Sequence, residues 1–273
     1  MFTLNCRGRL LVAETPLVMG IANITPDSFY KDSRFTIDNI LGHVEVMLRE
    51  GADIIDIGAQ STRPGSDFLT ADEELGRLKD IVPALVDHFP EAFFSIDSFY
   101  SEVAKECVEA GFAMINDISG GEIDKEMISV TASLNVPYIC MHMRGTPQTM
   151  TELNQYENLT REVLDYFIIK IQQCREAGIK DIIIDPGFGF SKNIEQNFEL
   201  LSNLSALKIT SKPILVGLSR KSTIYKTLHI SAEESLNGTT ALNTVALMKG
   251  AGILRVHDVK QAKECIKLFS KLS

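Results

Sequence analysis

Long apolar segments and breaks in composition are both absent from this chain of 273 residues. The apolar run nearest its start, Leu10 to Ala13, is too short for the core of a signal peptide, and no later run is as long as a transmembrane helix. No Pro/Ser-rich linker or block of like charges divides the chain. We therefore expect one domain over residues 1–273, located in the cytoplasm and independent of membranes.

The sequence also lacks the short motifs that mark several common cofactors and metals. It contains no GxxxxGKS or GxxxxGKT phosphate loop, no GxGxxG turn after a predicted strand and no cluster of His and Cys. Nucleoside triphosphates, nicotinamide cofactors and catalytic zinc are therefore disfavoured. The five cysteines are scattered and have no metal-type spacing, so reduced thiols are expected rather than a disulfide framework.

Positive charge is in short supply, because 27 Lys and Arg stand against 36 Asp and Glu and leave a formal net charge of −9. Nucleic acid or an anionic membrane surface would be repelled except at a local basic site. An anionic ligand must then be held by a few well-placed cations. We expect small-molecule substrates and no nucleic-acid or membrane partner.

What the sequence does contain is an alternation of short apolar runs with stretches of helical apolar spacing. The runs cover 16–23, 52–58, 92–97, 113–117, 137–142, 181–185, 213–219 and 253–257, and nearly all end in a polar residue. Helical patterns cover 37–49, 71–88, 102–109, 125–134, 161–176, 195–207, 241–249 and 261–272. This alternation predicts an α/β fold, the (β/α)8 TIM barrel, whose active sites lie at the carboxyl ends of the strands. Residues 3–16 predict a short N-terminal β-hairpin that could close the barrel floor.

Two connections at the expected active end do not begin as helices. Residues 25–35 follow the first run and residues 59–67 follow the second, and both are polar and rich in turn formers. Long connections at this end of a barrel commonly serve as lids or substrate loops. The alternative is a pair of solvated linkers.

Three of the runs end in residues that can bind ligands. The sixth leads into Asp185-Pro-Gly-Phe-Gly-Phe190, where a fixed carboxylate beside an aromatic wall would suit a planar ligand, although the Asp could instead cap the next helix. The seventh leads into Gly217-Leu-Ser-Arg-Lys-Ser222, and the eighth supplies Arg255 and His257 on one face. Because barrels often bind phosphate near their last two strands, these cations and hydroxyls favour an anion site over solvated charges.

Polar residues also end three of the other strands. Asp97 ends the third run, and the pair Asn116-Asp117 ends the fourth. Each acid alone could be an ordinary cap, but acids and amides at neighbouring strand ends can converge on one ligand. Asn23 ends the first run beside Thr25 and Asp27, and these residues offer oxygen ligands for a Mg²⁺ carried by a phosphate.

Seven motifs, in order and across essentially the whole chain, resemble the dihydropteroate synthase family. They are Asn23-Ile-Thr-Pro-Asp-Ser-Phe29, Ser61-Thr-Arg-Pro-Gly65, Ser95-Ile-Asp-Ser98, Asn116-Asp-Ile-Ser-Gly120, Asp185-Pro-Gly-Phe-Gly-Phe190, Gly217-Leu-Ser-Arg-Lys-Ser222 and Arg255-Val-His257. The resemblance implies a transferase of folate biosynthesis that moves the dihydropterin-methyl group from 6-hydroxymethyl-7,8-dihydropterin diphosphate to p-aminobenzoate and releases pyrophosphate. One departure is Ala59-Gln60, where Gly-Glu is common in the family, and it weakens any role assigned to that acid.

The resemblance also implies roles for individual residues. The pterin would be held by Asp97, Asn116, Asp185 and Lys221, among which Asp97, Asp185 and Lys221 are the expected catalytic residues. Pyrophosphate and Mg²⁺ would be received by Asn23, Arg255 and His257, with Asn23 as the metal ligand. The p-aminobenzoate site would be shaped by Thr62, Arg63, Pro64, Lys221 and Ser222, and the remaining substrate contacts would come from Phe190, Met141 and Gly217.

The residue types suit this reaction. A pterin edge has N–H donors that a carboxylate can accept, and it has acceptors that suit an ammonium or an amide. Loss of pyrophosphate places positive character on the pterin methylene, so we expect an SN1-like path with cations and Mg²⁺ at the leaving group. Because the arylamine is already a neutral nucleophile, positioning matters more than a strong general base.

Three other functions are open at this point. A related barrel could pass a methyl group from a folate to a corrinoid, but that reaction needs neither residues 61–65 nor a pyrophosphate site. A catalytically silent pterin binder would have no use for Lys221 and Arg255. A Schiff-base aldolase is disfavoured, because Lys221 follows its strand among polar neighbours rather than in an apolar pocket that would lower its pKa.

Inhibitors and partners also follow from the resemblance. The family is a target of sulfonamides and commonly forms homodimers, so both are expected here. The apolar stretch 241–248 could supply a dimer face or could pack on the barrel. If capture of pyrophosphate completes the amine site, p-aminobenzoate should bind measurably only beside a pterin, or beside pyrophosphate with Mg²⁺.

Overall fold

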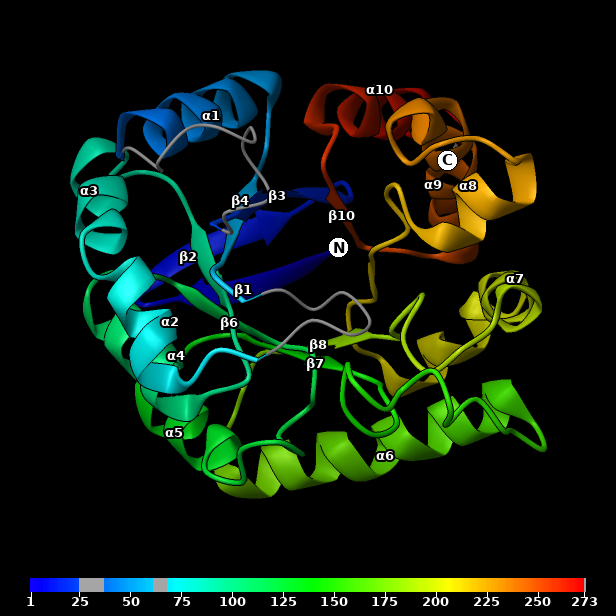
Figure 1. Cartoon of the computed structure of the whole chain (residues 1–273), viewed down its shortest axis with the longest axis horizontal. Coiled ribbons are helices and arrows are strands. Elements are labelled where there is room, and N and C mark those ends of the chain that lie inside the picture. Colours follow the sequence, from blue (N-terminus) through cyan, green and yellow to red (C-terminus); the bar gives the residue numbers. More distant parts are fainter. Residues whose placement is uncertain (25–36, 61–67, 273) are drawn as a thin grey trace.

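The computed structural model describes residues 1–24, 37–60 and 68–272. Within these residues, eight parallel strands form one sheet in the order β8-β7-β6-β5-β4-β3-β10-β9, with helices around it (Figure 1). A backbone bridge between Ile184 and Ile214 joins the two ends of the sheet and closes the barrel. The strands are β3 (Leu17–Asn23), β4 (Ile54–Gly58), β5 (Phe94–Asp97), β6 (Met114–Asp117), β7 (Tyr138–Met141), β8 (Ile182–Asp185), β9 (Leu215–Val216) and β10 (Ile253–Val256). The predicted TIM barrel is confirmed, and each predicted run contains one strand.

The helices lie outside the barrel and cover the outward faces of the strands (Figure 1). They are α1 (Ile37–Glu50), α2 (Ala71–Leu78), α3 (Ile81–His88), α4 (Ser101–Glu109), α5 (Met127–Leu134), α6 (Leu159–Ala177), α7 (Ile194–Ser202), α8 (Ser222–Leu228), α9 (Leu236–Lys249) and α10 (Val259–Phe269). Two 3₁₀ helices cover Leu204–Thr210 and Glu233–Ser235.

One predicted helix is two helices in the structure. The pattern over 71–88 breaks between α2 and α3, at Lys79 and Asp80. Pro83 explains the break, because it has no N–H to donate to the Lys79 carbonyl and its ring crowds that carbonyl. The apolar periodicity continues across the break, so the pattern by itself does not reveal it.

The boundaries of two further predictions were wrong. The pattern over 195–207 is α-helical only to Ser202 and then continues as a 3₁₀ helix. The helix predicted over 241–249 begins at Leu236, and the short helix α8 before it has no counterpart among the predicted helices. Polar and small residues occupy these segments, and their helical state depends on packing beside the barrel rather than on local apolar spacing.

The N-terminal hairpin closes the barrel floor, as expected. β1 (Phe2–Cys6) and β2 (Arg9–Ala13) pair antiparallel around Arg7 and Gly8, whose φ angles of 55° and 85° fit a two-residue turn. Alternate hairpin side chains are buried against the inward-facing side chains that begin the barrel strands. This cluster contains Leu4, Cys6, Leu11 and Ala13 together with Leu17, Met19, Ile54, Ala113, Met114, Ile139, Ile183, Leu215 and Ile253.

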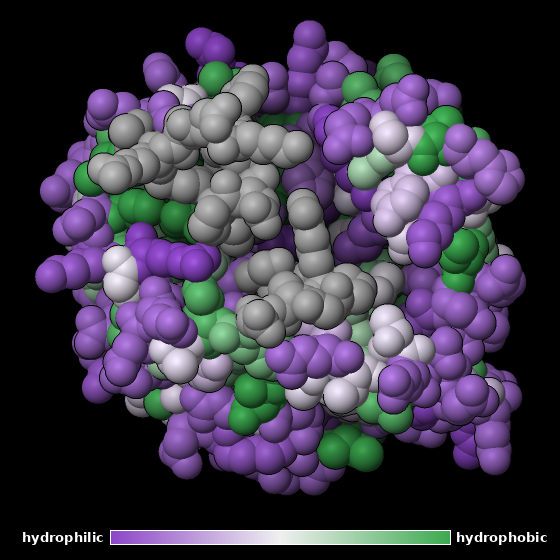
Figure 2. Space-filling model, in the orientation of Figure 1, coloured by the Kyte–Doolittle hydropathy of each residue, from purple (hydrophilic) through white to green (hydrophobic). Residues whose placement is uncertain are grey.

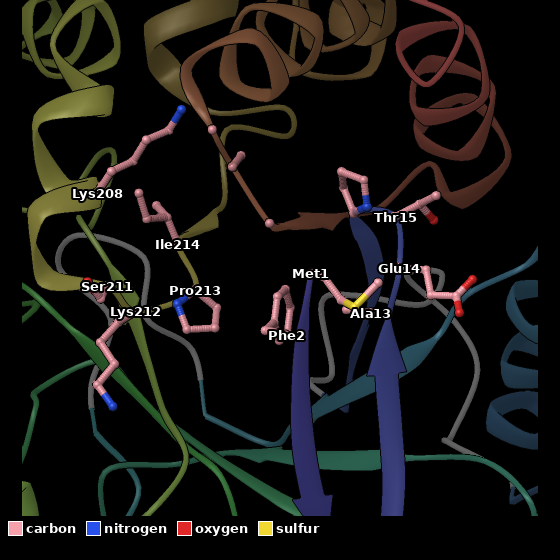
Figure 3. Close-up of a pocket in the computed structure, with 14 residues that line it drawn as sticks. Met1, Phe2, Ala13, Glu14, Thr15, Lys208, Ser211, Lys212, Pro213 and Ile214 are labelled. Atoms are coloured by element: carbon pink, nitrogen blue, oxygen red, sulfur yellow. The ribbon is translucent and has the colours of Figure 1, made fainter. Parts of the chain in front are cut away.

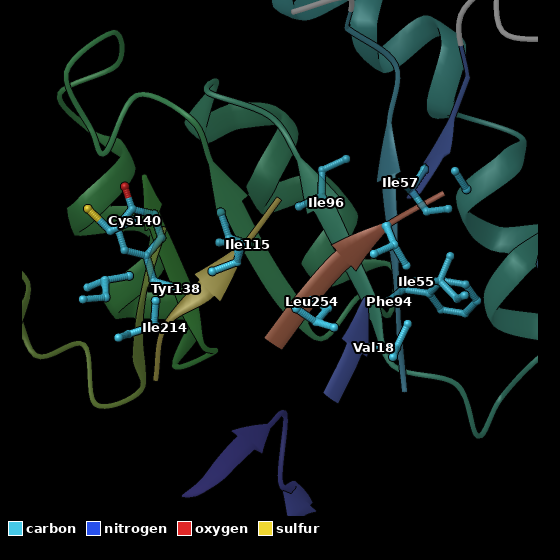
Figure 4. Packing of buried hydrophobic residues seen from close by; sticks show 14 of the residues in the cluster. Val18, Ile55, Ile57, Phe94, Ile96, Ile115, Tyr138, Cys140, Ile214 and Leu254 are labelled. Atoms are coloured by element: carbon cyan, nitrogen blue, oxygen red, sulfur yellow. The ribbon is translucent and has the colours of Figure 1, made fainter. Parts of the chain in front are cut away.

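The alternation of side chains along each strand separates the helix-facing core from the barrel interior. In β4, Ile55 and Ile57 point outward into the main core between strands and helices (Figure 4). Ile54 points inward and packs with the hairpin cluster, and Asp56 is the next inward residue. Residues two apart on a strand therefore form an apolar floor layer and a polar layer nearer the mouth.

The outer surface is mostly polar in the orientation of Figure 1, with apolar residues scattered among charged ones (Figure 2). Near the amino ends of the strands a pocket opens beside the hairpin, where Phe2, Pro213 and Ile214 line it with Lys208 and Lys212 (Figure 3). This pocket lies on the floor side and is separate from the polar strand ends. Among the helices of the described residues, none combines the length and apolar character needed to cross a membrane.

Candidate active site

An ion-pair network spans the barrel mouth and centres on Arg255. The guanidinium donates from Nε to Asp56 Oδ2 at 2.7 Å and from Nη2 to Asp97 Oδ2 at 2.6 Å. Asn116 donates from Nδ2 to the same Asp56 oxygen at 2.9 Å. Side chains from β4, β5, β6 and β10 thus meet at one point, as the strand-end pattern predicts for Asp97 and Asn116. Asp117 does not join them, because it accepts from the Ser119 and Gly121 N–H groups and from the Tyr138 hydroxyl.

Asp56 is absent from the predicted site residues, although it holds two of them. It is fully buried and its second oxygen, Oδ1, has no hydrogen-bond partner among the described residues. The signal was present in the sequence, because Asp56 interrupts an otherwise apolar strand at an inward position. An acid within a run is easily overlooked when only the ends of runs are searched.

Burial acts against the charge of the carboxylates at the mouth. It raises the pKa of Asp97, whereas Arg255 acts in the opposite direction. Burial likewise raises the pKa of Asp185, and the charge of Lys221 and the Gly187 N–H lower it. Burial has the larger effect, so the pKa of both carboxyls stays above its usual value, and the nearby cations only offset part of that rise.

Asp185 begins a tight turn that runs to Phe190. Its Oδ1 accepts from Gly187 N at 2.8 Å, and Gly187 and Gly189 have φ angles of 70° and 81°. A Cβ on Gly187 would lie 2.1 Å from the His142 carbonyl oxygen, so only glycine fits this close approach to the end of β7. The turn holds the Asp185 carboxyl and the Phe190 ring at the same end of the barrel.

Apolar side chains form a third part of the mouth. Met141 is buried at the end of β7 and belongs to a cluster with Phe99, Ile118, Met143 and Met150, against which Phe190 packs. The sequence predicted substrate contacts for Met141 and Phe190, and the structure places both in this one cluster. They lie beside the Asp185 turn.

Lys221 contacts the same turn. Its Nζ donates to the Phe188 carbonyl and lies 4.8 Å from the centre of the Phe190 ring. Gly217 lies beside it, since a Cβ there would be 3.8 Å from Nζ, an ordinary van der Waals contact. Ser222 follows Lys221 as the first residue of α8.

One argument from the sequence about Lys221 is wrong. Burial lowers its pKa to about 8, whereas Asp185 acts in the opposite direction. The ammonium lies near Asp185, Asp97 and Arg255, but burial has the larger effect on its pKa. The lowered pKa of Lys221 therefore does not disfavour a Schiff-base lysine.

His257 lies beside Ser219 at the predicted anion site. Ser219 Oγ lies 3.0 Å from His257 Nδ1 and accepts from the His257 backbone N–H at 3.2 Å. Desolvation beside the barrel mouth and the charges of Arg255 and Arg220 lower the pKa of His257, although the residue is exposed. At neutral pH, His257 therefore offers a hydrogen bond from Nε2 rather than a positive charge.

Arg220 is not the available cation that the motif suggested. Its Nε and Nη2 donate to the two oxygens of Asp258 at 2.9 and 2.7 Å, a bidentate pair. The prediction of two cations for a ligand after the seventh strand was thus wrong for Arg220, and only Lys221 faces the mouth.

Asn23 ends β3 beside Gly58 of β4, and Asp97 ends β5 on the other side of β4. A Cβ on Gly58 would lie 3.4 Å from Asn23 Oδ1 and 3.6 Å from Asp97 Oδ2. Several predicted residues cannot be placed in the same way. Thr25, Asp27, Thr62, Arg63 and Pro64 lie outside the described residues.

Gln60, where the family commonly has Glu, joins two backbone groups. Its Oε1 accepts from Leu69 N at 2.9 Å and its Nε2 donates to Leu69 O at 3.3 Å. A side-chain amide supplies both an acceptor and a donor, whereas an ionised carboxylate supplies acceptors only. The departure at Gln60 therefore has a structural explanation that does not involve acid chemistry.

Comparison with known proteins agrees with this geometry. The family model described as "pterin binding enzyme" matches residues 19–257. The dihydropteroate synthase of Escherichia coli K12 is 39% identical over 265 residues, covering 96% of this chain and 93% of the relative. The enzyme of the same name from Clostridium beijerinckii is 41% identical over 261 residues and covers 94% of each.

Solved structures give the same result. Yersinia pestis dihydropteroate synthase in a sulfonamide drug complex superposes with a TM-score of 0.93 at 37% identity, covering 99% of this chain and 98% of the other. Xanthomonas albilineans dihydropteroate synthase in complex with 7,8-dihydropteroate superposes with a TM-score of 0.89 at 33% identity, with the same coverage. The similarity thus extends over the barrel and all the described strand ends. This chain belongs to the dihydropteroate synthase family of pterin-binding enzymes.

Proposed function

We propose that the barrel mouth transfers the dihydropterin-methyl group from 6-hydroxymethyl-7,8-dihydropterin diphosphate to p-aminobenzoate and releases pyrophosphate. One observation carries the proposal. Asp185, Asn116 and Lys221 come from three different strand ends and offer an acceptor, an amide and a donor at one end of the barrel. A pterin edge presents groups of both kinds, so a single ring can satisfy all three.

In this proposal Asp185 accepts the N–H donors of the pterin. Asn116 is oriented by its bond to Asp56, which turns the amide oxygen away from that carboxylate and toward other donors. Lys221 provides a donor for a ring acceptor, and Phe190 supplies an aromatic face. Asp97, held by Arg255, completes the pterin contacts.

The charges at the mouth support an SN1-like path. In their ionised forms, Asp97 and Asp185 would stabilise positive charge on the pterin methylene as the leaving bond breaks. The same carboxylates would repel the departing pyrophosphate. We assign pyrophosphate to Arg255 and His257. The pyrophosphate would share the Arg255 guanidinium with Asp56 and Asp97, and His257 would add a neutral hydrogen bond.

Magnesium fits this arrangement through oxygen ligands. The described residues contain no cluster of three or more His, Cys, Asp or Glu side chains able to hold a metal by themselves. Mg²⁺ does not require such a cluster, since it commonly keeps waters and binds one or two protein oxygens with substrate phosphates. Asn23 Oδ1 is suited to that part. When bound, the ion would neutralise negative charge on the pyrophosphate.

The amine substrate needs positioning more than activation, because an arylamine is neutral and nucleophilic at neutral pH. We place p-aminobenzoate beside Lys221 and Ser222, with Thr62, Arg63 and Pro64 as further contacts. Sulfonamides, which the Yersinia pestis relative binds, would compete for this site.

Within residues 241–248 on α9, Ala246 and Leu247 pack in the core of the barrel, whereas Ala241 and Met248 are exposed. Only the exposed residues could contribute to a homodimer, which light scattering would test.

The experiment that tests the function is a direct assay with both substrates and Mg²⁺. We expect dihydropteroate and pyrophosphate to form in equal amounts, and we expect both to require p-aminobenzoate. Pterin binding without product would instead support the silent binder. Methyl transfer from a folate to an added corrinoid would support the methyltransferase.

A further inference from the structure

Lys192 lies just beyond the Asp185 turn and is almost completely buried, with 9% of its surface exposed. Its Nζ is 3.1 Å from the Gly187 carbonyl oxygen, 3.0 Å from the Phe190 carbonyl oxygen and 3.0 Å from His142 Nδ1. An ammonium has three hydrogens, and each has one partner here. Two of these partners belong to the turn that carries Asp185 and Phe190.

His142 is built to accept from this lysine. It is 3% exposed, and burial together with the Lys192 charge lowers its pKa well below the usual range, so its ring is neutral. Nδ1 then carries a lone pair for Lys192, and the ring lies edge-on against Tyr166, with centroids 4.9 Å apart. The His142 backbone N–H also donates to the Asp185 carbonyl at 2.9 Å. The end of β7 and the start of the turn are thus joined twice.

Two lysines donate to carbonyls of the turn. Lys221 takes the Phe188 carbonyl, and Lys192 takes those of Gly187 and Phe190. Within the turn, the Gly187 carbonyl also accepts from the Phe190 N–H at 3.1 Å, and the Phe190 carbonyl also accepts from Ser191 Oγ at 2.8 Å. The two lysines add further donors that link these carbonyls, and that of Phe188, to side chains outside the turn.

A purely structural lysine in the same protein has a different environment. Lys170 is also buried, but it forms an ion pair with Glu122. Lys192 has no ion pair among the described residues, and burial lowers its pKa to about 7, opposed by the charge of Asp185. Burying an ammonium without a paired carboxylate destabilises a fold, so its presence behind the Asp185 turn favours a functional reason.

We propose that Lys192, together with His142, is a positioning residue that holds the turn 185–190 in the form that binds the pterin. It acts through the backbone of the turn and so orients Asp185 and Phe190 without touching the ligand. This inference rests on the proposed function, in which the turn forms part of the pterin site.

The test compares two ligands on one variant. Lys192→Met keeps side-chain length and removes the charge and all three donors. We expect the affinity for 6-hydroxymethylpterin, measured by calorimetry, to fall by about tenfold or more, which corresponds to at least one lost hydrogen bond. The affinity for pyrophosphate with Mg²⁺ should stay within about twofold, because Arg255 and His257 lie on another strand end. KM for the pterin substrate should rise more than kcat falls.

Lys170→Met is the matched control, because it removes another buried lysine that does not contact the turn. We expect it to change melting temperature but neither ligand affinity. If Lys192→Met does not fold, His142→Leu leaves Lys192 in place with one partner fewer, and it should also weaken pterin binding selectively.

Three results separate the possibilities. Unchanged pterin affinity in folded Lys192→Met would overturn the positioning role and leave the proposed function standing. Equal loss of pterin and pyrophosphate binding would also overturn it and would assign Lys192 to stability alone. Failure of the wild-type protein to bind the pterin would instead overturn the proposed function, and with it the inference that depends on it.

Discussion

At the scale of single residues, side chains of one chemical type differ in role because their partners differ. Asp56 and Asp97 share Arg255, whereas Asp185 accepts from a backbone N–H and faces Lys221 only through space. The turn glycines and the surrounding cations keep Asp185 oriented toward the mouth. A change at Asp185 should therefore affect a ligand more than it affects the ion-pair network.

Asp185→Asn tests this acceptor. The amide would present a donor where the pterin also has one, and such a mismatch weakens binding by about 1–3 kcal/mol. Calorimetry with 6-hydroxymethylpterin measures the change, and Asp87→Asn on the exposed face of α3 is the control. Equal affinities in wild type and Asp185→Asn would remove this residue from the pterin site.

Lys221→Ala should reduce turnover more than any other single lysine-to-alanine substitution, apart from Lys192→Ala. It removes the cation between the proposed pterin and amine sites, together with the donor to the Phe188 carbonyl. Lys226→Ala on the exposed face of the same helix is the matched control. Lys192 is unsuitable as a control because it contacts the same turn. Similar kcat values for the two variants at positions 221 and 226 would contradict the assignment.

Glu74 introduces a pH dependence of stability. It is fully buried in α2, accepts from Ser98 Oγ at 3.1 Å, and burial raises its pKa to about 8. Between its unfolded and folded pKa values the folded state keeps a proton that the unfolded state has lost. The stability from this group is therefore complete at low pH and is lost as pH rises through about 8.

Glu74→Gln mimics the protonated acid and should remove that dependence. We expect the free energy of unfolding of the wild type to fall relative to Glu74→Gln as the pH rises from about 5 to about 8. Urea unfolding at several pH values measures the difference, with Glu102→Gln on the surface of α4 as control. A constant difference across this range would show that Glu74 is ionised throughout.

At the scale of elements, the hairpin and the strand ends perform separate tasks. Leu4 is 2% exposed and packs on the floor layer, whereas Leu10 on the same hairpin is 65% exposed. Leu4→Ala should lower the free energy of unfolding by about 2–5 kcal/mol, as expected for a buried leucine, and should leave KM unchanged. Leu10→Ala should change neither quantity. A shift in the KM for the pterin substrate in folded Leu4→Ala would show that floor and mouth are coupled.

At the scale of the whole molecule, binding at the mouth should stabilise the entire barrel. A ligand that binds only the folded state raises its stability, by about 2.7 kcal/mol at one hundred times its Kd. We expect pyrophosphate to raise the melting temperature, and Mg²⁺ to increase the shift. Asn23→Ala should abolish the Mg²⁺-dependent part and keep the rest. No shift at any pyrophosphate concentration would argue against an anion site at this end of the barrel.

Some predictions about the whole protein stay predictions. They are the single domain over 1–273, the cytoplasmic location, the homodimer and the dependence of p-aminobenzoate binding on a bound pterin or pyrophosphate. The homodimer and the location depend on surfaces and surroundings outside one chain, so contacts within the chain do not determine them.

The sequence by itself determined the barrel and the end of it that carries function. Apolar runs alternating with helical spacing lead to one fold, and the two-residue period of a strand places Asp97, Asn116, Asp185 and Arg255 at one end. These features depend on short-range periodicity, which can be recognised in a single sequence. Helix boundaries were less predictable, because packing and Pro83 override local apolar spacing.

Tertiary structure decided which partner each charged group has. Arg255 and Asp56 are 199 positions apart, and only barrel closure brings them within 2.7 Å. In the same way, Arg220 is bound by Asp258, and Lys192 is buried with His142 rather than solvated. Local sequence does not encode these pairings, because the energy of a charge depends on its burial and on neighbours that distant strands supply.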